Sequence, residues 1–202
     1  APILIYGGQE FEMLVAFLAS VKTGHAYIPV DSHSAKERLL MIQDTANSPL
    51  IIAVEPLPIE LPDLKIINLD QITQLQPLAK LTNNVAVSGN DNFYIIFTSG
   101  TTGKPKGVQI SHNNLLSFVN WLISDFQWPS QPNVLAQAPF SFDLSVMGLY
   151  PTLVTGGTLK ALPRTVTEDF KQLFATLPQL QLNVWISTPS LVEICLLLND
   201  FN

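Results

Sequence analysis

Short apolar runs alternate with helical patterns in the first part of this 202-residue chain, and this order restricts the fold more than any other feature. Four runs have the apolar character of buried strands: residues 2–6, 26–30, 50–54 and 65–69. Residues 11–21 have the spacing of an amphipathic helix, and Gly24 follows as a C-terminal signal. Ser34-Ala-Lys-Glu37 has the pattern of a capping box, which predicts a second helix through about Thr45. A β-α-β-α-β order implies an α/β fold, with a parallel sheet and helices on both faces.

A polar segment, 83–92, is rich in Asn, Asp, Ser and Gly and predicts a loop. We therefore expect a first α/β portion at 1–82 and a second at 93–202. The second portion repeats the alternation of strands and helices without repeating the sequence. Its predicted strands lie at 93–97, near Val134, at 159–162 and at 184–187, and its predicted helices at about 111–125, 144–154, 168–177 and from Ser190.

Composition excludes several classes of protein. Apolar residues make up 47% of the chain and charged residues 13%, against about 25% charged in globular proteins. Such a chain is either unusually buried or part of something larger that covers its faces. The net charge of −6 disfavours nucleic acid as a partner, and no run reaches the roughly 18 apolar residues of a membrane span.

Cysteine and histidine usage gives no metal or disulfide chemistry. The single cysteine, Cys195, excludes an internal disulfide and lies in an apolar, helix-like run, so we expect a buried, inert thiol. His25, His33 and His112 are scattered and lack metal-ligand spacing, so we expect no metal centre made of protein ligands.

A loop rich in glycine, hydroxyl groups and lysine follows the strand predicted at 93–97. Glycines permit positive φ and leave backbone N–H groups uncovered, so such a loop can direct several amides at one anion. The spacing fits neither a Walker A loop nor a dinucleotide fingerprint. A plain hairpin turn with solvated lysines is the alternative, but two lysines and four hydroxyls exceed what a turn requires. The candidate phosphate-binding residues are Thr98, Ser99, Gly100, Thr101, Thr102, Gly103, Lys104 and Lys106.

Asp143 is the second candidate, in the aromatic segment Phe140-Ser-Phe-Asp143 before a predicted helix. A carboxylate among aromatic side chains is costly unless it is paired, and a substrate ammonium group would be a suitable partner. The alternative is a helix N-cap, a position at which Asp is strongly preferred. Phe140 and Phe142, close to Asp143, are candidates for lining the pocket that would hold this substrate.

These segments together resemble a known family. The loop Thr98–Lys106 resembles the phosphate loop of the acyl-adenylate-forming superfamily. Val21–Asp31 resembles an early motif of amino-acid adenylation domains, although its residues predict structural roles, and Phe140–Val146 resembles their Phe-Asp-x-Ser motif. Residues 149–151, 156–158 and 183–190 resemble the members that activate D-alanine. The resemblance covers essentially the whole chain.

This resemblance implies an ATP- and Mg²⁺-dependent ligase with D-alanine and a D-alanyl carrier protein as partners. The amino-acid carboxylate attacks the α-phosphorus of ATP and expels pyrophosphate, and the phosphopantetheine thiol of the carrier protein captures the adenylate. The implied setting is D-alanylation of lipoteichoic acid, with the enzyme in the cytoplasm. The loop would hold the phosphates, and Asp143 would hold the α-ammonium group. Gly148 departs from relatives, which often carry a polar or bulky residue there.

The family's ribose-binding aspartate, hinge and C-terminal domain with its catalytic lysine have no counterpart in this sequence. We therefore expect both portions to belong to one larger N-terminal adenylation domain, with no catalytic residue among these 202 and little adenylate formation by them alone. Two other interpretations stay open. One is a peptide-synthetase adenylation domain for another amino acid, and the other is a non-catalytic nucleotide-binding or interaction module.

Overall fold

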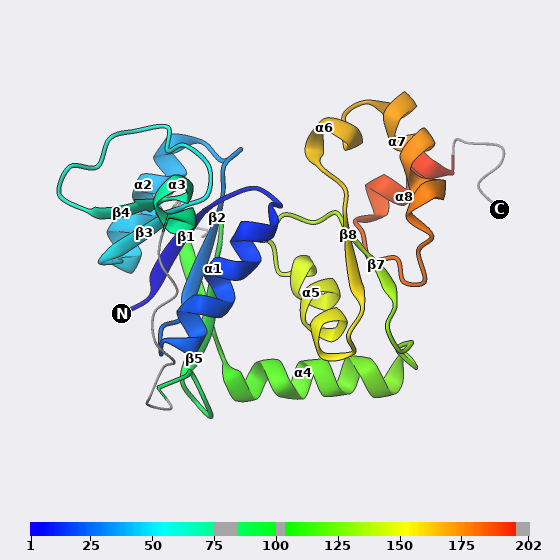
Figure 1. Cartoon of the computed structure of the whole chain (residues 1–202), viewed down its shortest axis with the longest axis horizontal. Coiled ribbons are helices and arrows are strands. Elements are labelled where there is room, and N and C mark those ends of the chain that lie inside the picture. Colours follow the sequence, from blue (N-terminus) through cyan, green and yellow to red (C-terminus); the bar gives the residue numbers. More distant parts are fainter. Residues whose placement is uncertain (75–84, 100–103, 197–202) are drawn as a thin grey trace. The chain divides into compact units, whose positions relative to one another are not determined.

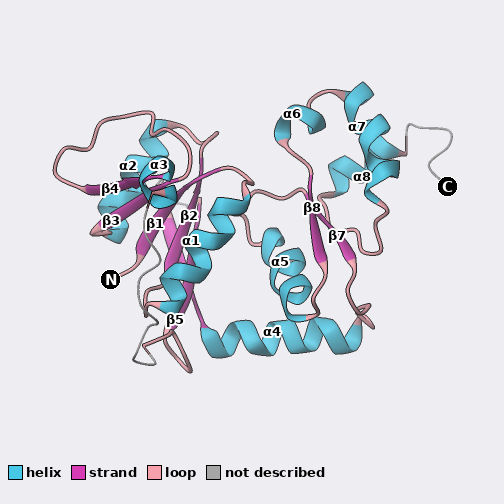
Figure 2. Ribbon diagram, in the orientation of Figure 1, coloured by secondary structure: helices cyan, strands magenta, loops and turns pink. Residues whose placement is uncertain are grey.

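The computed structural model describes residues 1–74, 85–99 and 104–196 of the chain (Figures 1 and 2). The chain forms two compact units, Ala1–Ser117 and Phe118–Asn202. The elements of the first unit are β1 (Ile3–Gly7), α1 (Phe11–Lys22), β2 (Tyr27–Asp31), α2 (Lys36–Ala46), β3 (Leu50–Ala53), β4 (Lys65–Asn68), α3 (Leu69–Thr73), β5 (Asn92–Thr98) and β6 (Lys106–Ser111). The boundary between the two units falls within helix α4 (His112–Asp125). The elements of the second unit that follow are β7 (Asn133–Ala136), α5 (Leu144–Val154), β8 (Thr158–Ala161), α6 (Arg164–Thr167), α7 (Phe170–Thr176), the 3₁₀ turn η1 (Leu177–Leu180) and α8 (Pro189–Cys195).

The first unit is built on a six-stranded sheet with the order β4-β3-β1-β2-β5-β6. Every neighbouring pair from β4 to β5 is parallel, and β6 returns antiparallel to β5. All five residues of β1 are buried, because a central strand of a parallel sheet is covered on both faces. The predicted parallel α/β sheet is thus confirmed.

Helices cover both faces of this sheet, since alternate side chains of each strand point to opposite faces. On one face, Leu4 of β1 belongs to the same buried cluster as Leu39 and Ile42 of α2. On the other face, Phe17 of α1 stacks on Tyr27 of β2, with ring centroids 4.1 Å apart. The expectation of helices on both faces is confirmed.

The second unit contains a parallel pair of strands, β7 and β8, in the register Val134–Leu159. Its core cluster contains Leu135 from β7 and Leu173 from α7, and it ends at Cys195 of α8, which is fully buried. Burial raises the pKa of the Cys195 thiol above its ordinary value, which disfavours the reactive thiolate form. The expected burial of this thiol is confirmed, and its inertness stays a prediction.

Two sequence-based predictions of local structure are wrong. Ser34 does not open a capping box: Ala35 is the N-cap of α2, and no side chain caps the helix. Ser34 instead lies in a turn, where its N–H donates to the main-chain oxygen of Asp31. The strand predicted at 184–187 is reduced to one bridge between Val134 and Val184. Beyond it, the Trp185 indole N–H donates to Ser187 Oγ.

The strand pairing divides the chain at a different point from the polar segment 83–92. Tyr94 of β5 pairs with Tyr27 of β2, and β6 pairs along β5, so residues 92–111 extend the first sheet. Residues 85–91 therefore connect parts of one unit. That both portions belong to one larger domain stays a proposal.

Two glycines of the second unit make a matched test of packing. A Cβ on Gly157 would lie 2.6 Å from the main-chain oxygen of Pro132, whereas on Gly148 its nearest neighbours would lie at 3.6 Å. We predict that Gly157→Ala lowers the free energy of unfolding by about 1–3 kcal/mol, the usual cost of overpacking. Gly148→Ala should be neutral or stabilise by up to about 1 kcal/mol, because alanine favours helix. Urea unfolding followed by circular dichroism measures both, and equal destabilisation would contradict the described packing.

Candidate functional site

The candidate phosphate loop joins β5 to β6, and its two ends are fixed by the sheet. Thr98 and Lys106 form the last register pair of the antiparallel ladder. Thr98, Ser99, Lys104 and Lys106 are all exposed, so the hydroxyls and ammonium groups at both ends can reach a ligand in solvent. Gly100, Thr101, Thr102 and Gly103 lie outside the described residues.

Close packing in the stem of the loop explains why glycine occupies position 107. Gly107 pairs with Phe97 across the two strands, and a Cβ added there would lie 3.0 Å from both Phe97 Cζ and Ile95 Cγ2. The freedom to adopt positive φ, expected of the glycines in this segment, is not used at Gly107. The missing side chain instead makes room for the buried ring of Phe97, which fixes where Thr98 emerges from the sheet.

Asp143 stands immediately before α5, and its carboxylate has no structural task among the described residues. The residue is exposed and occupies the N-cap position, but its backbone is helical and its side chain makes no capping hydrogen bond. The carboxylate forms no ion pair with any described residue. Asp143 therefore occupies the N-cap position without making the hydrogen bond of an N-cap, and its carboxylate stays available to a ligand.

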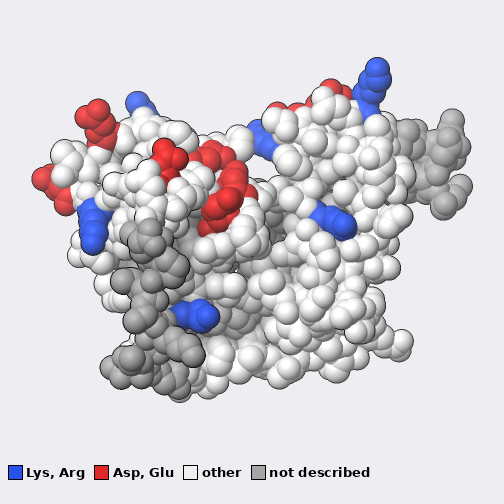
Figure 3. All heavy atoms as spheres, viewed as in Figure 1, with Lys and Arg blue, Asp and Glu red and all other residues white. Residues whose placement is uncertain are grey.

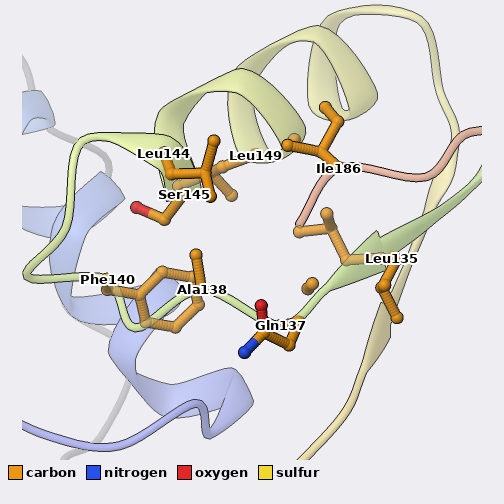
Figure 4. Close-up of a pocket in the computed structure, with 11 residues that line it drawn as sticks. Leu135, Gln137, Ala138, Phe140, Leu144, Ser145, Leu149 and Ile186 are labelled. Atoms are coloured by element: carbon orange, nitrogen blue, oxygen red, sulfur yellow. The ribbon is translucent and has the colours of Figure 1, made fainter. Parts of the chain in front are cut away.

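A small pocket lies beside the first turns of α5 in the second unit (Figure 4). Leu135, Phe140 and Leu149 give it an apolar wall. Phe142, by contrast, does not line it and is 60% exposed. The structure thus places Phe140 on the pocket, and a ligand role for Phe142 stays a prediction.

Gln137 and Ser145 supply the polar side chains of this pocket, and no sequence pattern had pointed to Gln137. Its Oε1 is buried and accepts no hydrogen bond within the described residues, and Figure 4 shows its amide among the side chains that line the pocket. A single glutamine after an apolar strand carries no sequence signal for this role.

Acidic side chains gather at the edge of the first sheet where β1, β2 and β3 end. The Gly8 N–H donates to Glu10 Oε2 at 2.8 Å, and Glu55 follows β3. The pKa of the Glu10 carboxyl is raised from 4.5, first by burial and then by the hydrogen bond to Glu55 and its charge. The pKa of Tyr6 is raised by burial and by Glu55 and Asp31. Figure 3 shows acidic side chains gathered on a face that is otherwise mostly uncharged.

Neither a metal centre nor a membrane helix emerges from the part of the chain that the structure describes. Among those residues, no group of three or more His, Cys, Asp or Glu could hold a metal ion. Within the same residues, every helix is too short or too polar to cross a membrane.

Comparison with known proteins agrees with this architecture. Residues 1–202 match the family model described as AMP-binding enzyme. The chain is 60% identical to a D-alanine–D-alanyl carrier protein ligase of Lacticaseibacillus rhamnosus, over 99% of this chain and 40% of that protein. It is 54% identical to a ligase of the same name from Streptococcus agalactiae serotype V, over 100% of this chain and 40% of that protein. The chain therefore spans about 40% of the length of these relatives.

Solved structures show the same fold. A four-domain nonribosomal peptide synthetase bound to AMP and glycine superposes with a TM-score of 0.83 at 25% identity, over 98% of this chain and 15% of that one. An o-succinylbenzoate CoA synthetase from Bacillus subtilis, in complex with its acyl-adenylate intermediate, superposes with a TM-score of 0.82 at 15% identity. The match covers 97% of this chain and 51% of that one. The fold is thus that of the N-terminal part of adenylate-forming enzymes. The chain belongs to the AMP-binding enzyme family.

The raised pKa of Glu10 predicts a pH-dependent stability. A carboxyl that binds its proton more tightly in the folded state costs stability as pH rises above 4.5, the ordinary pKa. Glu10→Gln, which can still accept from Gly8, should therefore be more stable than the parent at pH 7, with a gain that shrinks toward pH 4.5.

Urea unfolding at several pH values checks this prediction. In the Glu55→Gln background, Glu10→Gln should increase the free energy of unfolding by less, because the neighbouring charge of Glu55 is already gone. A gain that is independent of pH would contradict the role assigned to this carboxyl pair.

Proposed function

We propose that this chain forms part of an ATP-dependent ligase that activates D-alanine as D-alanyl-adenylate. The ligase then transfers D-alanine to the phosphopantetheine thiol of a carrier protein. The observation that carries the proposal is the 60% identity, over 99% of this chain, to a D-alanine–D-alanyl carrier protein ligase. The hairpin that ends in Thr98 and Lys106 supports it independently.

The first chemical requirement is to bring a carboxylate to a polyphosphate, which like charges oppose. The hydroxyls of Thr98 and Ser99 and the ammonium groups of Lys104 and Lys106 are exposed at the two ends of one loop. We assign them, with Gly100, Thr101, Thr102 and Gly103, to the β- and γ-phosphates and the departing pyrophosphate. Fixed donors of this kind stabilise charge without reorganising during the reaction.

The second requirement is to aim the amino-acid carboxylate at the α-phosphorus. The exposed carboxylate of Asp143, without a capping bond, suits a substrate ammonium group, and holding that group orients the rest of a small amino acid. Acyl substrates such as fatty acids have no ammonium group, so Asp143 favours an amino acid.

Mg²⁺ belongs to the proposal as a partner of the phosphates. In phosphoryl chemistry Mg²⁺ is held by one or two carboxylates together with substrate phosphates. The ion would neutralise phosphate charge, while the residues above hold and orient the two substrates.

The remaining partners follow from the proposed reaction. The product is consumed in D-alanylation of lipoteichoic acid, and we place the ATP-dependent step in the cytoplasm. A peptide-synthetase adenylation domain for another amino acid is the second candidate, supported by the fold of the synthetase bound to AMP and glycine. Its 25% identity is far below that to the ligases.

Amino-acid-dependent exchange between ATP and pyrophosphate tests the proposal. The full-length ligase that contains this chain should catalyse exchange with D-alanine in preference to L-alanine and glycine. Exchange with L-amino acids and none with D-alanine would reject the proposed substrate. No exchange with any amino acid would favour a non-catalytic module.

The phosphate role predicts the behaviour of a Lys106 variant. In the full-length ligase, Lys106→Ala should raise the KM for ATP about ten- to hundredfold, as expected for a lost bond to a charged group. Thermal stability should hardly change, because Lys106 is exposed. Lys171→Ala, which removes an exposed lysine of α7, is the matched control and should behave as the parent. An unchanged KM for ATP would leave Lys106 as merely solvated charge.

The ammonium role predicts the behaviour of an Asp143 variant. Loss of one partner of a desolvated charge pair commonly costs about 2–5 kcal/mol. Asp143→Asn should therefore raise the KM for the amino acid about thirtyfold or more and leave the KM for ATP within a few fold. The matched control is Asp169→Asn, because Asp169 does cap a helix, accepting from the N–H groups of Lys171 and Gln172. Kinetics like the parent's for Asp143→Asn would remove the assigned role.

A further inference from the structure

Arg38 makes a long-range contact with the root of the phosphate loop. It lies in the first turn of α2, and its Nη2 donates to the main-chain oxygen of Phe97 at 2.7 Å, across 59 residues of sequence. Phe97 directly precedes Thr98, the first of the proposed phosphate-binding residues. The bond is partly buried, so water competes with it only in part.

The strand that carries Phe97 needs such a partner. In the described structure, β2 and β5 share a single register pair, Tyr27 with Tyr94. Three residues further along β5, the main chain of Phe97 has passed beyond that pairing. A buried backbone carbonyl without a partner is costly, so a donor from outside the sheet fixes this part of the strand.

Helix α2 also holds the Phe97 side chain. Phe97 is 6% exposed and belongs to the buried cluster that includes Leu39 and Ile42 of α2. On the hairpin side, Gly107 leaves room for its ring. The residue before the loop is thus fixed at its carbonyl by Arg38, and at its ring by α2 and the facing strand.

The charge of Arg38 suits a position beside an anion site. The guanidinium is always protonated and has five N–H donors, of which one serves Phe97. Among the residues that the structure describes, it forms no ion pair with a carboxylate, so no direct partner neutralises its positive charge.

We propose that Arg38 is a positioning residue for the phosphate loop and acts through the main-chain oxygen of Phe97. The inference rests on the proposed function, because it assigns Arg38 to the ATP side of that reaction. The hydrogen bond sets the direction in which Thr98 and Ser99 leave the sheet, so that their donors face the polyphosphate before it binds. Such preorganisation lowers the cost of binding.

Two measurements test this role. In the ligand-free 202-residue chain, Arg38→Met keeps an apolar stem and removes every donor. The amide resonances of Thr98 and Ser99 should then shift or broaden, while those of Leu4 and Ile51 in the sheet core stay unchanged. In the full-length ligase, the KM for ATP should rise about tenfold or more, as expected for loss of a bond from a charged donor. The KM for the amino acid should stay within about twofold, because Arg38 acts on the ATP side alone.

Conservative and matched variants keep the test decisive. Arg38→Lys keeps the charge and one donor and should recover part of the ATP affinity; if the Met variant does not fold, the Lys variant should still shift the Thr98 and Ser99 amides. Arg164→Met removes an exposed arginine that forms an ion pair with Glu168, and should leave the KM for ATP unchanged.

The possible outcomes separate this inference from the proposed function. Unchanged Thr98 and Ser99 amides in the Met variant, or in the Lys variant where that one carries the test, would overturn the inference, whatever happens to the kinetics. An effect of Lys106→Ala on ATP use, without one of Arg38→Met, would also overturn it and leave the proposed function standing. If neither variant affects ATP use, the phosphate role of the loop fails together with this inference.

Discussion

Burial of β1 on both faces is the constraint on which the first unit depends. All five residues of the strand are buried, and neither face can be covered without helices on both sides of the sheet. Because β1, β2, β3 and β5 are parallel, the loops that follow them leave the sheet at one edge. The two ends of the candidate phosphate loop, the Glu10–Glu55 pair and the first turn of α2 lie at this edge for this reason, where ligands bind in open α/β sheets.

The sheet therefore does more for the loop than support it. Phe97 is held by main-chain pairing, by the core and by the space that Gly107 leaves. Rigid elements position donors better than a free loop would, and preorganised donors are what an anion-binding site requires. In the second unit α5 has the corresponding task, since it presents Asp143 at its first turn while its own face packs on β7.

Much of this fold could be predicted from the sequence, because its strongest signals are local. Apolar runs and helical spacing located α1, α4 and α5 with nearly their observed bounds. Pairing between distant segments was harder: residues 92–111 join the first sheet through one register pair, which no local pattern encodes. The capping box at Ser34 failed because a turn at Asp31 competed for the same residues.

The candidate site, like the fold, has parts that local sequence signals predict and parts that depend on tertiary contacts. Composition pointed to the loop, and the resemblance to the Phe-Asp-x-Ser motif pointed to Asp143. The contact from Arg38 to Phe97 and the buried oxygen of Gln137 depend on tertiary packing, and each residue type is common in unrelated roles.

Titration of the ¹⁵N-labelled chain with pyrophosphate, followed by NMR, tests the central claim most directly. We expect the largest amide shifts at Thr98, Ser99, Lys104 and Lys106, and largest shifts elsewhere in the protein would contradict the assigned phosphate site.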